Sequence, residues 1–313
     1  MNLSALFAVG QTALELGLIC SLTVLALFLS YSMLNVCDLS TDGCFTLGAA
    51  VGAVVAAAGH PLLSIPAAML AGVCSGFITA IMQTKLGINS LLSGIIVNTG
   101  LYSVNIMVMS GKSQINLNKK ATVFTMMRGF LAETPLKNQY VTVVAALAVV
   151  LTVLFLTLFL NTRLGLAIRA TADNPDMVRS SSINPVFTTI VGLCVANAFT
   201  GLSGCLMAQS QQSAEINIGG SMVTIALASL LIGSTLMGKG NIFTRAVGMV
   251  LGAFVFRLVY AIALRLNMPA FMLKLVSSVI VALALALPYL KDQWPVISRR
   301  LSYKKSAAGR EVK

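Results

Sequence analysis

Few residues of this chain could carry acid–base or metal chemistry. It has one histidine, His60, and nine acidic residues among 313, whereas general acid–base catalysis needs such groups positioned together. No Walker loop, GxSxG elbow or HExxH helix occurs. The six cysteines form no CxxC pair and lie mostly in apolar runs, which favours buried apolar roles over disulfides or a metal site. We therefore expect no catalytic residues, no metal, no cofactor and no ATP hydrolysis by this chain.

The composition is that of a membrane protein, with 57% hydrophobic and 10% charged residues. The apolar residues come in blocks of roughly 18 to 23, which is the length a helix needs to cross about 30 Å of hydrocarbon. The alternating pattern of a membrane barrel is absent. We predict an all-α polytopic membrane protein with about nine to ten transmembrane helices, some short or broken.

Nine apolar runs are candidates for spans: residues 12–34, 44–59, 61–82, 90–109, 140–160, 186–208, 220–237, 242–264 and 269–290. The second and seventh runs are short, so the count is open by one or two. Glycines 48, 52, 72 and 76 have the four-residue spacing of close helix contacts. The predicted organisation is a transmembrane domain, residues 1–290, followed by a basic tail, residues 291–313.

The distribution of charge predicts the orientation. The net charge is +12, and the basic residues lie in loops and the tail, as orientation signals do, without the aromatic groove of a nucleic-acid-binding protein. The tail should therefore be cytoplasmic, and counting back places residues 161–185 in the cytoplasm and the N-terminus outside. The loop 110–139 has five basic residues and one acid, which argues against its predicted outer position, so an even number of spans remains an alternative.

Residues 163–185 form the largest polar segment between the later spans. Asn174 can cap a helix, and Pro175 suits the first helical position. Asp176 then meets the positive end of the helix dipole. Asn184 precedes Pro185 and so favours a stop. The pattern predicts a short helix in a cytoplasmic loop.

The same loop resembles a conserved segment of ABC importer permeases of the branched-chain amino acid and ribose type. The matching positions are Thr162, Gly165, Ala167, Arg169, Ala170, Asp173, Asn174, Pro175, Arg179 and Ile183, whereas Val178 and Ser182 depart mildly. In that family the short helix docks in a groove of an ATPase subunit. The resemblance therefore implies a coupling loop, residues 161–185, with these contact residues: Arg163, Gly165, Arg169, Asp173, Asn174, Pro175, Asp176, Met177, Val178, Arg179 and Ile183.

Physically, Met177, Val178 and Ile183 would form an apolar docking face, with Asp176 and Arg179 pairing at its rim. An ordinary amphipathic loop helix is the alternative.

A second segment narrows the resemblance. The letters DLSTDG at residues 38–43, followed by FTLGAA at 45–50, look like the signature of permeases assigned to tryptophan and tyrosine uptake. Further matches at residues 85–89, 91–95, 101–105 and 111–113 extend it over about residues 10–290. The resemblance implies a multi-pass permease of the bacterial cell membrane that imports an aromatic or other amino acid. Its implied partners are an ABC ATPase subunit that binds the ATP, an extracytoplasmic solute-binding protein and a second permease copy in a homodimer.

Two polar breaks resemble each other. In each, an acid stands five residues before a glycine that opens a short span: Asp38 before Gly43, and Glu215 before Gly220. Paired broken helices mark the transport route in inverted-repeat transporters, although chance similarity is the alternative. The candidate pathway residues are Asp38, Ser40, Asp42, Gly43, Asn98, Asn105, Glu215 and Gly220.

Other uses of these polar residues stay open. Asp42 can cap the helix that begins near Gly43, and we prefer that role for it. Asn98, Asn105 and Asn197 could equally bond between helices. Arg257 is a charge deep in the eighth run, where a paired or functional residue is the default expectation.

Two rival classes remain. An ion-coupled secondary transporter or channel would act without an ATPase, but it would need intramembrane acids, of which the spans have almost none. A membrane scaffold or enzyme is the third class, and it fits the glycine-rich spans and the missing catalytic residues less well.

Overall fold

The computed structural model describes residues 3–265 except 119, 131–138 and 239, together with isolated residues between 275 and 286. This part of the chain is overwhelmingly helical, which confirms the predicted fold class. The ninth predicted run and the basic tail fall largely outside the described residues. The elements in order are α1 (Leu3–Leu27), η1 (Phe28–Met33), α2 (Thr41–Ala57), α3 (Pro61–Thr84), α4 (Ser90–Val108), β1 (Gln114–Asn116), α5 (Val123–Phe130), α6 (Tyr140–Asn161), α7 (Arg163–Asp173), α8 (Pro175–Ser180), α9 (Pro185–Ser210), β2 (Ser213–Glu215), α10 (Met222–Met237) and α11 (Ile242–Arg265).

Six of these helices, among the described residues, are long and apolar enough to cross a membrane: α1 with η1, α3, α4, α6, α9 and α11. They correspond to six of the nine predicted spans. The second and seventh predicted spans are α2 and α10, with 17 and 16 residues. At 1.5 Å per residue each is about 25 Å long, short of the roughly 30 Å of a full crossing.

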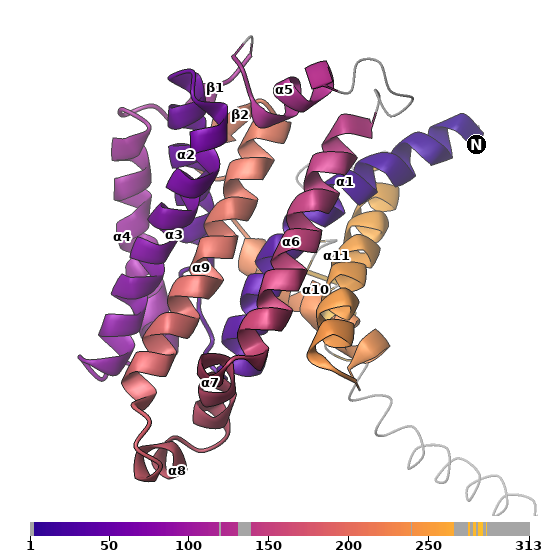
Figure 1. Cartoon of the computed structure of the whole chain (residues 1–313). Helices are drawn as coiled ribbons and strands as arrows, with labels where there is room; N and C mark the ends of the chain where they lie inside the picture. Colours follow the sequence, from indigo (N-terminus) through magenta and orange to yellow (C-terminus); the bar gives the residue numbers. More distant parts are fainter. Residues whose placement is uncertain are drawn as a thin grey trace, which may run out of the picture.

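The loops separate to the two ends of the bundle, as Figure 1 shows. α7 and α8 lie at one end, whereas β1, β2 and α5 lie at the other. β1 and β2 pair antiparallel, with Gln114 opposite Glu215 and Asn116 opposite Ser213. The described parts of the loop 110–139 and the loop 209–221 therefore share one side, opposite residues 161–185, as the predicted span count requires.

α9 is the central helix, and it approaches its neighbours through glycines. A Cβ atom on Gly48 of α2 would lie 2.2 Å from the Gly201 carbonyl oxygen of α9, and one on Gly204 would lie 2.0 Å from the Phe45 carbonyl oxygen. Gly72 of α3 approaches Asn197 in the same way. The predicted packing role of these glycines is confirmed, because no side chain fits between the two backbones.

This contact gives a first testable prediction. We expect Gly48→Val to destabilise the purified protein by about 1–3 kcal/mol, since added bulk must push α2 from α9. Thermal unfolding in detergent would measure the loss. Gly100 of α4, where a new Cβ meets nothing within 4 Å, is the control, and Gly100→Ala should leave stability unchanged or raise it. Equal melting of the Gly48 variant and the wild type would refute the tight contact.

Candidate functional site

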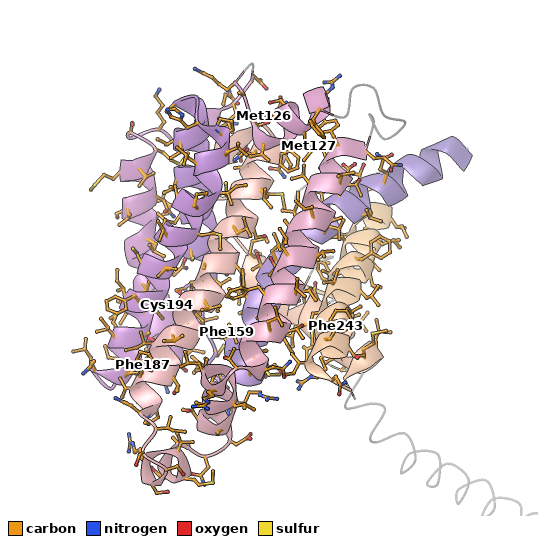
Figure 2. All side chains as sticks on the ribbon, viewed as in Figure 1. Met126, Met127, Phe159, Phe187, Cys194 and Phe243 are labelled. Carbon is orange, nitrogen blue, oxygen red and sulfur yellow. The ribbon has the colours of Figure 1, made fainter. Side chains whose placement is uncertain are left out.

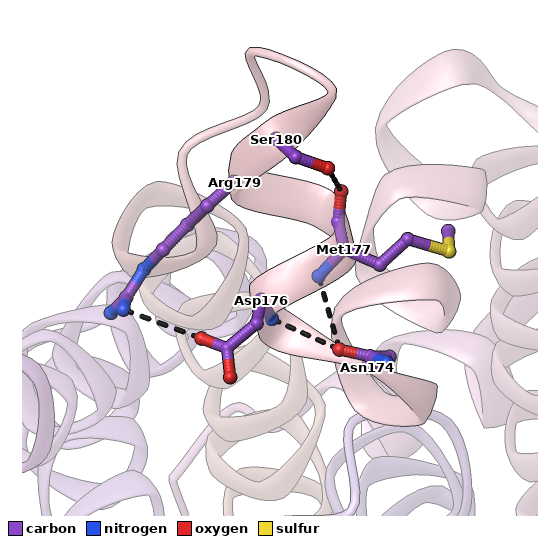
Figure 3. Close-up of polar contacts among 5 residues, drawn as sticks. All are labelled: Asn174, Asp176, Met177, Arg179 and Ser180. Atoms are coloured by element: carbon purple, nitrogen blue, oxygen red, sulfur yellow. Dashed lines mark hydrogen bonds and ion pairs between the residues drawn. The ribbon is translucent and has the colours of Figure 1, made fainter.

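The loop of residues 161–185 contains two short helices, α7 and α8. Thr162 caps α7, and Asn174 caps α8 by accepting hydrogen bonds from the backbone N–H groups of Asp176 and Met177, at 3.1 and 3.0 Å. Figure 3 shows this cap. Pro175 occupies the first turn, so the predicted start of the short helix is confirmed. α7 was not predicted, although Thr162 followed by an amphipathic run was the available signal.

The exposed face of α8 differs in part from the predicted one. Met177 is 56% exposed and Ile183 37%, so both are accessible to a partner. Val178 is only 1% exposed, which makes its predicted role at the docking face wrong. Because α8 packs on α7 and α9, Val178 anchors the helix to the bundle. Asp176 and Arg179 form an ion pair with each other at 3.6 Å on the exposed side.

The remaining loop residues divide into exposed and structural ones. Arg163, Asp173 and Pro175 are exposed. Gly165 is buried where α7 turns back on α6, and a Cβ there would meet the Phe159 carbonyl oxygen at 2.3 Å. Arg169 is partly buried, and its Nε has no hydrogen-bond partner.

A cavity of about 460 Å³ lies between this loop and the first polar break. Thr171 and Arg179 line one side, and Asn35 and Val36 line the other. Gln83 also lines it and has a buried Nε2 without a hydrogen-bond partner. Movement of α8 would thus reach the segment that leads into α2.

Asp38 is at the centre of a buried polar cluster. It is 2% exposed, and its carboxylate accepts hydrogen bonds from the backbone and hydroxyl of Ser40 at 2.8 and 2.6 Å and from Asn197 of α9 at 2.7 Å. Thr79 of α3 donates to the Ser40 hydroxyl. Asp38 and Ser40 are therefore both buried in this conformation and link the start of α2 to α3 and α9.

Asp42 caps a helix other than the expected one. Its carboxylate accepts hydrogen bonds from the backbone N–H groups of Ser221 at 3.3 Å and Val223 at 2.7 Å, at the start of α10. Thr46, one turn further along α2, accepts from the Gly219 N–H. The prediction of a cap on α2 itself is wrong, because the orphan N–H groups that Asp42 satisfies belong to α10.

The two polar breaks thus meet in space at the starts of two short helices. α2 runs from this junction toward the end with β1 and β2 (Figure 1), and its alanines pack against Leu117 and Ala214 there. α10 runs to the turn before α11. We call the contact of Asp42 and Thr46 with residues 219–223 the helix-start junction.

The other candidates fall around this junction or away from it. Asn98 of α4 lies beside Gly43, where a new Cβ would be 2.7 Å from its Oδ1. Asn105 is buried and donates to the Gly43 carbonyl at 3.2 Å. Gly220 is exposed at the junction, whereas Glu215 belongs to β2 and accepts from Gln114. Asn105 is therefore a link between helices, and Glu215 part of the outer ribbon.

Arg257, the charge deep in the eighth run, contacts α1. Its Nη2 lies 2.8 Å from the Cys20 sulfur, and its guanidinium stacks on Tyr260. Neither Cys20 nor Tyr260 is an acidic residue that would pair with the charge of Arg257. Within the described part of the chain, His, Cys, Asp and Glu side chains nowhere gather as a metal site.

Comparison with known proteins identifies the family of this chain. Residues 11–288 match the family model described as branched-chain amino acid transport system, permease component. The chain belongs to this permease family. No solved structure matches it.

Two relatives resemble this permease over most of its length. It is 34% identical over 272 residues to a tyrosine transport system permease protein of Clostridioides difficile, covering 86% of this chain and 88% of the relative. It is 28% identical over 283 residues to an uncharacterized protein of Rickettsia prowazekii, covering 88% and 96%. The permease is thus a multi-pass membrane protein of a transport system, as its sequence predicts.

Proposed function

We propose that this permease is the membrane subunit of a binding-protein-dependent ABC importer of the bacterial cell membrane, with a cytoplasmic C-terminus. The observation that carries the proposal is the helix-start junction in a chain of the permease family. Short helices that start within the membrane and point their N-termini at one place are a recurrent form of transport site.

The junction suits an amino acid as substrate. A helix N-terminus attracts a carboxylate, and the Asp42 carboxylate attracts an ammonium group. Asp42 keeps exposed surface, and Ser221 and Thr224 beside it are exposed. The tyrosine transport relative supports an aromatic amino acid among the possible substrates.

The exposed polar surface also supports a homodimer. Asn98 of α4, which lies beside Gly43, keeps part of its surface exposed, and Thr99 and Ser103 on the same helix are exposed. Polar side chains that face lipid are costly, so a second copy would cover this side and enclose the route between the two copies. The solute-binding protein would dock on the end that carries α5 and the β1–β2 ribbon.

The coupling loop would transmit the ATPase movement. Partner ATPase subunits would bind ATP and hold α8 through Met177 and Ile183. Val178 fixes α8 to the bundle, and the cavity beside Asn35 and Val36 gives the segment before α2 room to move. A displacement of α8 would then shift α2 and the α10 start that Asp42 holds.

Reconstitution tests the proposal. The full chain would be purified with its co-purifying ATPase and binding protein, and uptake of labelled tyrosine into liposomes would be measured with and without ATP. ATP-dependent uptake that requires both partners is expected. Uptake by the permease alone under an ion gradient would instead establish a secondary transporter and refute the proposal.

A further inference from the structure

A large apolar groove lies on the side of α9 away from the helix-start junction. α9 uses Gly201, Gly204 and Cys205 to approach α2 and α3, whereas Cys194 and Phe199 face the groove. α3 and α6 form its two walls, and its volume is about 970 Å³. We call it the α6 groove.

The groove lies at the depth of the hydrocarbon, because the three helices that form it all have the length and apolarity of spans. Its lining is almost wholly apolar. Thr152 is the exception, and its hydroxyl is already bonded to the Ala148 carbonyl within α6. Unfilled space would forfeit dispersion contacts along all three helices, so an apolar occupant is expected.

The end of the groove that α5 covers shows whether a helix of a second copy or a lipid fits there. α5 contacts both α6 and α9, and Val123 and Met127 of α5 line the groove. Figure 1 shows α5 across the ends of α6 and α9, and Figure 2 shows Met127 at that end with Cys194 far along α9. A spanning helix of a second copy would run into α5, whereas a lipid chain ends at the interface.

A positive charge stands at this same end. Arg128 is exposed, follows Met127 directly and lies over the ring of Tyr140 at 5.9 Å, where α6 begins. Among the described residues the ion pair formed is Arg179 with Asp176, so none of the described carboxylates neutralises Arg128. A guanidinium at the membrane surface binds phosphate well.

We propose that the α6 groove binds an anionic phospholipid, with two acyl chains between α3 and α6 and the phosphate at Arg128. A methylene group takes roughly the space of a water molecule in the liquid, about 30 Å³. The groove therefore has room for about thirty methylene groups, which corresponds to two ordinary acyl chains. The proposed orientation of the permease, on which this point rests, places the lipid in the outer leaflet.

Native mass spectrometry of the permease released from nanodiscs tests the site. The nanodiscs would contain equimolar phosphatidylglycerol and phosphatidylethanolamine. We expect one retained phosphatidylglycerol per chain. Arg128→Gln should lower the preference for phosphatidylglycerol about fivefold, the effect of about 1 kcal/mol per basic residue at the surface, and Arg128→Lys should keep most of it.

A second experiment fills the groove with larger side chains and measures lipid retention again. Ala148→Leu with Leu151→Trp should abolish retention of the lipid, since both positions line the groove. Val150→Trp is the matched control on the same helix, because Val150 is exposed but lies outside the groove. Its lipid retention and melting temperature should equal those of the wild type.

Three outcomes would overturn the proposal. A wild-type protein that carries no lipid would do so, and so would a groove-filled variant that keeps it. If the filled variant instead loses its dimer in light scattering, the groove is a contact between copies. Because the measurement uses neither ATPase nor uptake, it is independent of the proposed transport function.

Discussion

The permease with Met177→Asp and Arg179→Glu should insert normally but fail to co-purify with the ATPase subunit proposed as its partner. Met177 is the large exposed apolar side chain of α8, and a carboxylate in its place would be buried unpaired on docking. The second substitution leaves Asp176 beside a new acid instead of its present ion-pair partner. The loss of one such anchor typically costs about 2 kcal/mol or more, which is about a thirtyfold weaker complex.

Affinity capture of the tagged permease from membranes, with quantification of the ATPase, would measure this effect. Lys85→Glu is the control, because Lys85 is exposed in the connector that the proposed orientation also places in the cytoplasm. It changes charge in the same direction away from α8 and should leave capture unchanged. Undiminished capture of the ATPase by the double variant would remove the basis for a coupling role of α8.

The second large effect is expected at Asp42. Asp42→Ala would leave the N–H groups of Ser221 and Val223 without their charged acceptor at the start of α10. Hydrogen bonds to charged groups contribute about 2 kcal/mol each, so the junction should open and uptake should fall about thirtyfold or more. Asp42→Asn keeps one acceptor oxygen and should give an intermediate rate.

Uptake in the reconstituted system would be compared at equal protein content. Ser229→Ala is the control on the same helix, because the Ser229 hydroxyl is bonded to the Ile225 carbonyl within α10. That variant should transport at nearly the wild-type rate. If Asp42→Ala also does so, the helix-start junction is not part of the transport route.

Local features of the fold were predictable from neighbouring residues. The cap formed by Asn174 and the position of Pro175 depend on N–H groups two and three residues away, so their residue types suffice. The long spans follow equally from uninterrupted apolar runs. The resemblance of the loop and of residues 38–50 to known permeases anticipated the family.

The partners of individual residues, such as the groups that Asp42 and Val178 contact, were not predictable. Asp42 lies about 180 positions before the N–H groups that it caps, and nothing in the local sequence selects α10 over α2. Val178 looked available for docking because an apolar residue in a polar loop has no visible partner. Only the packing of α8 on α7 and α9 buries it.

The sequence by itself therefore predicted the membrane class, the apolar runs that form the six long spans, the tight glycine contacts of α2 and α3, and the position of α8. Those features depend on composition, spacing and near neighbours. Tertiary structure alone decided that the two polar breaks meet, that Asp38 and Asn105 bond between helices, and that α5 closes an apolar groove. Each of these depends on which distant helices pack together, because a polar group excluded from water must bond to whatever donor or acceptor the fold brings near.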